Sequence, residues 1–520
     1  MNLYQYLKNA ADSAPNKLFL IKESVSYSEF IKRIARRAAI LESDGVVAGD
    51  VVGILARNIP EFLITAWAAW QVGARVLLLD NKLTHDDYEN MTSLVNCKIV
   101  YAEERFIFQT KKIKFCDICA PDKDIKKTPK IVDVSGDEIA TLQFTSGSTG
   151  VPKIVPLTHN NLIAAADGLE DLRGYIDDGD DFLLFLPLFH IFGLAFITLN
   201  AIHYRGGVVL ETSGNPREIV KNFRIYKPRV VPAVPRIWEI IRNMIISEYK
   251  NHGTWSAANW ILRHQKLLRF FHLNQLVRQM QWPVHEMFGR RRATLIGGGA
   301  AVKPEIIEFF EWFGFDFLQG YGLTEGSGPN CVSLPRPGRY VGSVGMPLRP
   351  NDFRIQNQDK SGVGELWLRG PMIFSGYLDN VAATNEIFNN GWMNTGDLAR
   401  TDKNGEIHIC GRAKNVIVLG SGKNVFPDEL EAAYITIDGV KNVMVIEFDG
   451  RVFGIFQVDD YITLEKLGAK IEVVNKKIAP YKQVVHFAIT TENLPATSSG
   501  KNRHFIAKEL LKAGAYPNRK

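Results

Sequence analysis

The sequence predicts an α/β protein with two domains, and three features of its 520 residues support this prediction. Short apolar runs alternate with helical patterns over the first 350 residues, which is typical of parallel sheets covered by helices. Shorter strands separated by Gly, Asn and Asp turns follow up to residue 412. About 100 further residues then have a compact α+β pattern. We therefore expect a large N-terminal domain of parallel-rich sheets with flanking helices and a β-rich subdomain, and a small, mobile C-terminal domain.

Five apolar runs have the length and composition of buried strands: Val51–Leu55, Ala140–Phe144, Phe182–Leu186, Val208–Leu210 and Thr294–Ile296. Between them, Glu61–Gln71 and Asn160–Gly168 have helical periodicity, and Thr158 is suited to cap the second of these helices. Pro235 is suited to the first position of another helix. This alternation predicts mainly parallel sheets.

Domain boundaries follow from the change of pattern. Residues 350–412 contain the short strands Gly364–Gly370 and Asn404–Arg412 of the expected β-rich subdomain. The segment Val440–Phe448 reads as a strand and Leu464–Ala479 as a helix of the tail. We assign residues 1–412 to the N-terminal domain, 413–415 to a hinge and 416–520 to the C-terminal domain.

Composition excludes several classes of protein. With 46% hydrophobic and 23% charged residues, the chain has the composition of a folded globular protein. Lys8 and Asp12 interrupt any apolar core of an export signal. The longest apolar run, Phe62–Trp70, is much shorter than the roughly 20 residues needed to span a bilayer. Five sparse cysteines favour a reducing compartment, so we expect a cytoplasmic location. We expect no nucleic-acid partner.

The net charge of +6 is concentrated in one segment. Residues 251–292 contain seven Lys or Arg and only one acidic residue, Glu286, so the rest of the chain has no net charge. Apolar residues at 261, 262, 268, 271, 276 and 280 alternate with these bases, which indicates an amphipathic basic helix. Such a helix can rest on the inner face of an anionic membrane. It can equally pack on its own domain with a solvated basic face.

A loop of small residues follows the predicted strand that ends at Phe144. It consists of Thr145, Ser146, Gly147, Ser148, Thr149, Gly150, Val151, Pro152 and Lys153. Backbone N–H and hydroxyl groups of such a loop can surround phosphate oxygens, while Lys153 supplies positive charge. The loop lacks the Gly-Lys-Ser/Thr ending of a Walker P-loop. We interpret it as a phosphate-binding loop, and a flexible linker is the alternative.

Further candidates lie downstream. Tyr321 in the segment Gln319, Gly320, Tyr321, Gly322 offers a flat face for a base, and Thr324 with Glu325 offers oxygen ligands for Mg²⁺. Asp397 can accept hydrogen bonds from two ribose hydroxyls, and Arg412 can donate to the same sugar. Lys501, in Leu-Pro-Ala-Thr-Ser-Ser-Gly-Lys, can neutralise developing negative charge. Individually, each of these residues also fits a turn, a core position or a solvated loop.

Taken together, the motifs TSGSTGVPK, QGYGLTE, GWMNTGD, GRAKN and LPATSSGK resemble the acyl-adenylate-forming superfamily, whose members bind AMP. The resemblance covers essentially the whole chain. Residues 231–239 and the segments FGRRRATLIGGGAAVKPEIIEFF and GRAKNVIVLGSGKNVFPDELE look like the long-chain fatty acyl-CoA synthetases of this superfamily.

The resemblance implies a first half-reaction in which a carboxylate attacks the α-phosphorus of ATP and expels pyrophosphate. Residues 145–153 would hold the β- and γ-phosphates, and Thr324 and Glu325 the α-phosphate and Mg²⁺, with Thr145 near the metal. Tyr321 would contact adenine. Lys501 would approach both the carboxylate and the α-phosphate, and its loss is expected to cripple adenylation.

In the implied second half-reaction the C-terminal domain would rotate about Lys414 and withdraw Lys501. The loop Gly420, Ser421, Gly422 would then face the pantetheine arm of CoA, whose thiol attacks the adenylate. His190 would lie beside the acyl carbonyl, although a core histidine is the alternative. Gly297, Gly298, Gly299 and Ala300 would border adenine and the acyl tunnel. The superfamily often has Ser-Gly-Gly-Ala-Pro there, and this chain departs from it at Gly297 and Ala301.

The resemblance leaves the acceptor and the acid open. We expect a medium- or long-chain fatty acid and transfer to CoA. One alternative is transfer to the phosphopantetheine thiol of an acyl carrier protein. Another is a non-catalytic homologue that binds only nucleotide or acyl groups, but such a chain would be expected to lose Lys501, Glu325 or Asp397, and all three are present.

Overall fold

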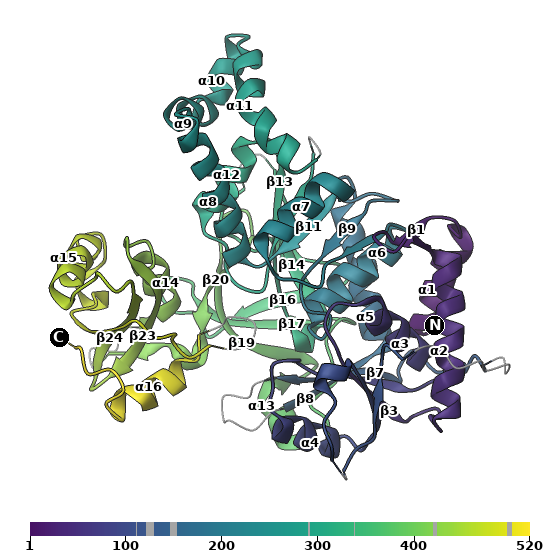
Figure 1. Cartoon of the computed structure of the whole chain (residues 1–520). Coiled ribbons are helices and arrows are strands. Elements are labelled where there is room, and N and C mark those ends of the chain that lie inside the picture. The colour runs from purple at the N-terminus through teal and green to yellow at the C-terminus, as the bar shows by residue number, and fades with distance from the viewer. Residues whose placement is uncertain are drawn as a thin grey trace. The chain divides into compact units, whose positions relative to one another are not determined.

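The computed structural model describes residues 1–110, 112–120, 129–145, 153–289, 292–336, 339–419, 424–496 and 502–519. The chain divides into two compact units (Figure 1). The first unit comprises Met1–Asp352 and Arg369–Gly391, and the second comprises Phe353–Leu368 and Trp392–Lys520. The predicted hinge at 413–415 stays a prediction.

The first unit contains a six-stranded sheet in the order β6-β5-β3-β4-β7-β8. Every neighbouring pair is parallel except β7 and β8, which form an antiparallel hairpin. The strands are β3 Val51–Leu55, β4 Arg75–Leu78, β5 Cys97–Ala102, β6 Phe115–Asp117, β7 Ile139–Thr145 and β8 Lys153–Thr158. The strand β3 has the bounds that the sequence predicts, Val51–Leu55, and all five of its residues are buried.

A nine-stranded sheet is the second layer of this unit, in the order β15-β14-β13-β12-β11-β9-β10-β1-β2. Its central pairs from β13 to β1 are parallel, and both edges are antiparallel. The strands are β1 Leu18–Leu20, β2 Val25–Ser26, β9 Phe182–Leu184, β10 Val208–Leu210, β11 Val230–Ala233, β12 Thr294–Gly297, β13 Asp316–Leu323, β14 Gly328–Ser333 and β15 Met346–Pro347. The predicted parallel-rich sheets are therefore confirmed.

Helices pack between and around these sheets. α2 (Tyr27–Ser43) packs on β1 and β2, whereas α3 (Pro60–Gln71) packs on β3 and β4, and the two helices contact each other. Ten of the twelve residues of α3 are buried, as expected of a helix enclosed on all sides. The remaining helices are α1 Leu3–Ser13, α4 His85–Leu94, α5 His159–Asp167, α6 Asn200–His203, α7 Pro216–Tyr226, α8 Pro235–Asn251, α12 Pro304–Trp312 and α13 Val381–Ile387, and a π-helical segment η3 spans Phe192–Leu199.

Two predicted helix starts are confirmed. Pro235 opens α8, where its missing N–H costs nothing. Thr158 caps α5, because its hydroxyl accepts the Asn161 N–H at 3.1 Å, and the Asn161 side chain accepts the Thr158 N–H at 3.0 Å. The short strand β8 lies between the small-residue loop and α5, and the sequence pattern does not identify it.

The basic segment is three helices, not the single helix that the sequence predicts. They are α9 Trp255–Arg263, α10 Gln265–Phe270 and α11 Asn274–Met287, and they project beyond α8 and α12 (Figure 1). The chain turns at His264 and at Phe271–Leu273, where His272 has a φ of +59°. Of the six apolar residues in the predicted amphipathic pattern, Leu262 and Leu268 are buried, but Phe271 and Leu276 are exposed.

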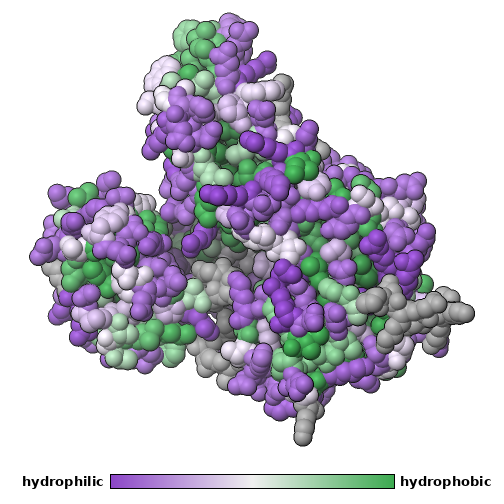
Figure 2. All heavy atoms as spheres, viewed as in Figure 1, coloured by the Kyte–Doolittle hydropathy of each residue, from purple (hydrophilic) through white to green (hydrophobic). Residues whose placement is uncertain are grey.

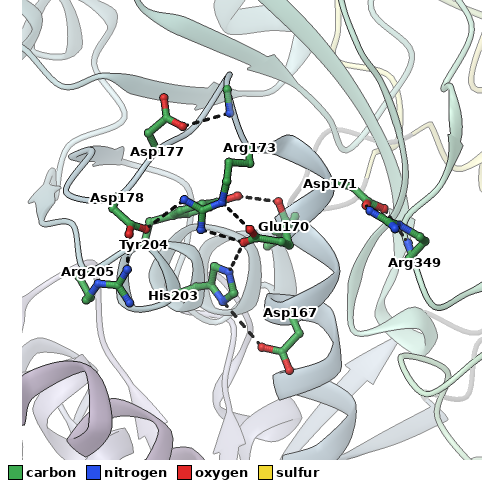
Figure 3. Close-up of polar contacts among 12 residues, drawn as sticks. Asp167, Glu170, Asp171, Arg173, Asp177, Asp178, His203, Tyr204, Arg205 and Arg349 are labelled. Carbon is green, nitrogen blue, oxygen red and sulfur yellow. Dashed lines mark hydrogen bonds and ion pairs between the residues drawn. The ribbon is translucent and has the colours of Figure 1, made fainter. Parts of the chain in front are cut away.

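A charged network surrounds the short helix η2 (Gly168–Leu172) in the first unit (Figure 3). Glu170 pairs with Arg173 and lies 3.2 Å from His203, and the Arg349 guanidinium donates to Asp171 at 2.7 Å. Most of these side chains are exposed, and each exposed pair contributes little to stability. Their effect is to connect segments near residues 170, 203 and 349 that are distant in sequence.

The second unit contains two further sheets. One sheet contains the strands β16 Asp352–Gln356, β17 Gly364–Arg369, β19 Trp392–Thr401 and β20 Ile407–Arg412, and β19 pairs antiparallel with both β17 and β20. The short strand β18 (Phe388–Asn389) lies in the residues of the first unit. A three-stranded sheet has the order β23-β24-β25, with the strands β23 Val440–Phe448, β24 Arg451–Val458 and β25 His486–Thr490. The other elements are the strands β21 Ile417–Val418 and β22 Asn424–Val425 and the helices α14 Pro427–Tyr434, α15 Leu464–Asn475 and α16 His504–Lys512.

The three-stranded sheet has an apolar core on each face. One core contains Tyr434, Phe456 and Ile471, and the other contains Ile455, Ala507 and Leu511. The expected α+β character of the tail is confirmed, and β23 has the predicted bounds. Among all described residues, no helix is both long and apolar enough to cross a bilayer.

Candidate active site

The two ends of the small-residue loop lie side by side on a hairpin. Thr145, the last residue of β7, pairs with Lys153, the first of β8, and the Thr145 hydroxyl donates to the Lys153 carbonyl at 3.5 Å. The hairpin therefore holds Lys153 beside Thr145, so the first and last residues of the loop are adjacent. The predicted residues Ser146, Gly147, Ser148, Thr149 and Gly150 lie outside the described residues.

Tyr377 joins two predicted site residues that are far apart in sequence. Its hydroxyl donates to Glu325 Oε1 at 2.9 Å, and Lys153 Nζ lies 4.7 Å from the centre of its ring. A cation on the face of an aromatic ring is an attractive arrangement. One ring thus holds a carboxylate and an ammonium group in the same neighbourhood. Tyr377 follows Gly376 in what reads as a turn, and no pattern in the sequence identifies it.

The end of β13 carries the predicted adenine and metal residues. Gln319, Gly320, Tyr321 and Gly322 are consecutive strand residues, and Thr324 and Glu325 follow in a short 3₁₀ turn. Gly322 must be glycine, because a Cβ atom there would lie 1.9 Å from the Gly328 carbonyl oxygen. This close approach allows β13 and β14 to form the hairpin that presents Thr324 and Glu325.

Two observations test whether ATP and Mg²⁺ fit these residues. The buried Gln319 Oε1 has no hydrogen-bond partner in the described parts of the chain, so it can accept a hydrogen bond from a ligand. Glu325 uses one carboxylate oxygen for Tyr377, which leaves the other for a metal ion. Carboxylate and hydroxyl oxygens are the ligands that Mg²⁺ prefers. The donor set of Thr324 and Glu325 therefore fits Mg²⁺.

The segments that carry the residues predicted to border the acyl group approach each other at Phe192. The glycines 297–299 are at the end of β12, and a Cβ atom on Gly298 would be 3.0 Å from the Phe192 ring. Phe192 is two residues after His190, which is half-buried. Asn58 fixes the loop before His190, because its side-chain amide donates to the Leu186 carbonyl at 2.8 Å and accepts the Leu188 N–H at 3.0 Å. Ala300 follows the three glycines and is exposed.

In the second unit, the predicted ribose residues form an ion pair. Asp397 on β19 lies opposite Arg412 on β20, and Arg412 Nε is 2.9 Å from Asp397 Oδ1. The Asp397 side chain is 8% exposed and that of Arg412 is 49% exposed. Arg412 also donates to the Thr395 carbonyl at 3.0 Å. The pair therefore has a rigid, mostly buried carboxylate beside an accessible guanidinium.

Lys414, the predicted hinge residue, lies in the short 3₁₀ turn η5 (Ala413–Asn415). Lys501 and the loop Gly420, Ser421, Gly422 lie outside the described residues. The residues directly after Lys501 are described, and they are bound to one carboxylate. The Asn502 side chain donates to Glu431 Oε2 at 3.2 Å, and His504 Nε2 is 2.6 Å from Glu431 Oε1.

This Glu431 network extends to Asn415, next to the predicted hinge residue. Asn415 Nδ2 lies 3.3 Å from His504 Nδ1, and the Val445 N–H donates to Glu431 Oε1 at 2.8 Å. Ligand atoms of Asp428, Glu431 and His504 lie within 4.8 Å of one another, which is also the spacing of a metal site. Because hydrogen bonds already use Glu431 Oε1, we interpret the cluster as a positioning network. Sequence patterns do not identify it.

Two histidines have pKa values shifted in opposite directions. Burial lowers the pKa of His504, but the hydrogen bond with Glu431 and the charges of Glu431 and Asp428 outweigh this and raise it above its usual value. Burial and the positive N-terminus lower the pKa of His159, at the start of α5, to about 4. His159 is therefore neutral near pH 7, which allows its Nδ1 to accept the Leu3 N–H at 3.1 Å.

Known proteins are similar to this chain over nearly its whole length. The family described as AMP-binding enzyme matches residues 7–378. The 2-succinylbenzoate–CoA ligase of Oceanobacillus iheyensis is 26% identical over 516 residues, which cover 97% of this chain and 98% of the relative. The feruloyl-CoA synthase of an Amycolatopsis species is 27% identical over 508 residues, covering 92% of each chain.

A third relative matches a shorter part. The long-chain-fatty-acid–CoA ligase FadD15 of Mycobacterium bovis is 32% identical over 323 residues, which cover 58% of this chain and 51% of the relative. Among solved structures, the O-succinylbenzoate coenzyme A synthetase of Bacillus subtilis in complex with AMP has a TM-score of 0.81 at 22% identity, covering 96% of this chain and 97% of its own. The same synthetase with ATP and magnesium has a TM-score of 0.79. These structures show a common fold.

Proposed function

The chain belongs to the AMP-binding enzyme family and is an AMP-forming acid–thiol ligase, and from this premise we propose that its acid is a medium- or long-chain fatty acid. ATP and Mg²⁺ serve the reaction, and CoA is a substrate rather than a cofactor. The observation that carries the proposed chemistry is the Lys153–Tyr377–Glu325 arrangement, because it supplies a phosphate-binding cation and a metal-binding carboxylate in one place.

The residues of the first unit have distinct proposed roles. Lys153 and residues 145–150 neutralise the β- and γ-phosphates, and Tyr321 with Gln319 and the glycines beside it contacts adenine. Glu325 and Thr324, with Thr145 nearby, hold Mg²⁺, which supplies charge neutralisation at the phosphates. His190 and the residues Gly297–Ala300 contact the acyl side of the substrate. Alignment and charge neutralisation account for most of the catalysis in such a transfer.

The residues of the second unit complete the proposed chemistry. Asp397 accepts the ribose hydroxyls, and Arg412 holds Asp397 and donates to the same sugar. Lys501 neutralises the two anions as a carboxylate oxygen bonds to the α-phosphorus and the bond to pyrophosphate breaks. In the second step the thiolate of CoA attacks the acyl carbonyl, AMP leaves, and the thiol proton passes to solvent. We propose that motion about Lys414 exchanges Lys501 for the loop 420–422 between these steps.

A second candidate for the acid is an aromatic acid. The two relatives that match nearly the whole chain are named for 2-succinylbenzoate and feruloyl groups, both aromatic. The fatty-acid assignment is supported by the motif resemblance and by the relative with 32% identity, which matches a shorter part. The alternative acceptor is the thiol of a carrier protein. The alternative to an enzyme is a homologue that binds nucleotide or acyl groups without turnover.

Acid-dependent exchange of labelled pyrophosphate into ATP tests the proposal. Purified protein is assayed with acetate, octanoate, palmitate, 2-succinylbenzoate and ferulate. We expect the highest exchange rate with octanoate or palmitate, and thioester formation with CoA but not with a carrier protein. A clear preference for an aromatic acid would overturn the fatty-acid assignment. Folded protein that exchanges with none of the acids would overturn the enzymatic function.

The Lys501→Ala variant tests the adenylation step. We expect the exchange rate to fall about a hundredfold or more, because one group that stabilises developing charge is lost. ATP affinity, measured by calorimetry, should change little, since the other nucleotide contacts remain. Lys403→Ala, an exposed lysine of the same unit, is the control and should exchange like the unaltered protein. An unchanged rate in Lys501→Ala would refute the role of Lys501.

A further inference from the structure

The projection formed by α9–α11 carries an exposed apolar surface that the proposed reaction does not use. Of the 23 large apolar or aromatic side chains that are exposed in the described parts of the chain, seven lie between residues 260 and 282. They are Trp260, Leu267, Phe270, Phe271, Leu273, Leu276 and Trp282. Isolated apolar side chains are common on protein surfaces, but a dense group indicates a binding surface. We call these seven residues the apolar tip.

The apolar tip is not needed to hold the projection together. The inner faces of α9–α11 are buried through other residues, among them Leu262, Leu268 and Val277. The base of the projection is fixed to the end of α12, because the Gln265 and Gln281 side chains donate to the Trp312 carbonyl at 3.1 and 2.7 Å. Phe270 and Phe271, by contrast, are 76% and 60% exposed. The structure thus holds two adjacent phenylalanines in water on a well-anchored support.

Basic side chains are interleaved with the apolar tip. Lys266 and Arg269 flank Leu267 and Phe270 on α10, and Arg278 lies on α11. All three bases are exposed. Figure 2 shows apolar and strongly hydrophilic side chains next to each other at the outer end of the projection.

We propose that the apolar tip and its bases bind the surface of an anionic lipid bilayer. Aromatic side chains favour the boundary between headgroups and acyl chains, and long basic side chains can lie along apolar surface while their charges reach lipid phosphates. The net charge of +6 on residues 251–292 complements an anionic lipid surface. Lipid binding by these residues does not depend on which acid the enzyme activates.

Vesicle co-sedimentation tests the proposal without any turnover. We expect the protein to sediment with vesicles of equal parts phosphatidylcholine and phosphatidylglycerol, and to remain in solution with phosphatidylcholine alone. Binding should weaken as salt is raised, because the attraction between surface charges is screened. Absence of binding to the anionic vesicles at low salt would overturn the proposal, as would equal binding to both kinds of vesicle.

Two variants with matched controls locate the binding surface. Phe270→Ser with Phe271→Ser should lower binding at least tenfold, whereas Val381→Ser with Val473→Ser, two exposed valines elsewhere, should not. Lys266→Glu, Arg269→Glu and Arg278→Glu together should abolish the preference for anionic lipid, at roughly fivefold per charge. Lys32→Glu, Lys360→Glu and Lys403→Glu give the same net charge from exposed lysines outside the projection and should retain the preference.

Two readouts make each result decisive. The pyrophosphate exchange rate with a water-soluble acid should be equal in all variants, which shows that they are folded whatever the lipid result. Sedimentation velocity of the unaltered protein should show no association that the phenylalanine variant abolishes. If the unaltered protein associates and the phenylalanine variant does not, the apolar tip joins two copies of the chain and the lipid proposal is wrong. Equal vesicle binding by the variants and their controls would also overturn it.

Discussion

At the scale of single residues, Tyr377 has the most specific contacts in the candidate site. Its hydroxyl is 2.9 Å from Glu325, and its ring is 4.7 Å from the Lys153 ammonium group. The hydroxyl fixes the direction of a carboxylate that we propose binds Mg²⁺. We therefore propose that Tyr377 is a positioning residue, which acts through Glu325 and Lys153 rather than on the substrate itself.

Tyr377→Phe removes the hydroxyl and keeps the ring under Lys153. We expect the pyrophosphate exchange rate to fall roughly tenfold, because a hydrogen bond to a charged group is worth about 1.5–3 kcal/mol. The dependence on Mg²⁺ concentration should shift to higher values, whereas the KM for the acid should not change. Tyr461→Phe, an exposed tyrosine of the second unit, is the control. Unaltered magnesium dependence in Tyr377→Phe would show that Tyr377 does not position Glu325.

The sequence predicts these individual residues unevenly. Asp397 and Arg412 can be paired in advance, because both suit the same sugar, and the structure places their charged groups 2.9 Å apart. Tyr377 cannot be identified this way, since its partners Lys153 and Glu325 come from segments that are distant in the sequence. The sequence does not identify Asn58 for the same reason, because its role depends on backbone groups of residues 186 and 188. Contacts between distant segments leave no local pattern.

At the scale of elements, α14 connects two functional segments through Glu431. This side chain binds Asn502 and His504, which follow Lys501, and His504 contacts Asn415 next to the hinge residue. We expect the network to set where the chain leaves the Lys501 loop. The raised pKa of His504 makes its contribution pH-dependent, because the charged imidazole binds Glu431 more strongly.

Glu431→Ala should release the residues that follow Lys501. We expect trypsin to cleave faster after Lys501 and Arg503, and the exchange rate to fall roughly tenfold. Glu429→Ala, on the same helix but paired with the partly buried Lys482 on the other side, is the control. Mass spectrometry of timed digests and the exchange assay measure both effects. Equal cleavage in the two variants would mean that Glu431 does not hold this segment.

The contribution of the His504–Glu431 hydrogen bond to the free energy of unfolding should change with pH in a definite direction. A histidine whose pKa is raised by folding stabilises the folded state fully below its unfolded pKa of about 6.5, and this contribution is lost as the pH rises through the folded value. The difference in unfolding free energy between the unaltered protein and Glu431→Ala should therefore be larger at low pH than at high pH.

Elements with strong local patterns are predicted well. The strands Val51–Leu55, Val208–Leu210 and Val440–Phe448 have the expected bounds, because each is an apolar run ended by turn residues. The basic segment was predicted as one helix and is three. Its amphipathic pattern continues across His264 and His272, where the backbone turns, so periodicity alone does not reveal the breaks.

At the scale of the whole molecule, the proposed two-step reaction requires motion about residues 413–415. Lys414→Pro should restrict this motion, because proline fixes φ near −65°. We expect pyrophosphate exchange within about twofold of the unaltered protein, but at least tenfold slower thioester formation with CoA. Lys414→Ala is the control for loss of the side chain. If both half-reactions slow equally in Lys414→Pro, these residues do not act as a hinge.

The placement of charge on the projection has a further effect, on solubility. Residues 251–292 carry the whole net charge of +6, so the remaining chain is electrically neutral near pH 7. Neutral proteins repel one another weakly and tend to associate, whereas a net charge keeps copies apart. The bases beside the apolar tip therefore have a second use. When the proposed lipid surface is absent, we expect them to provide repulsion that keeps the seven exposed apolar side chains of one copy from meeting those of another.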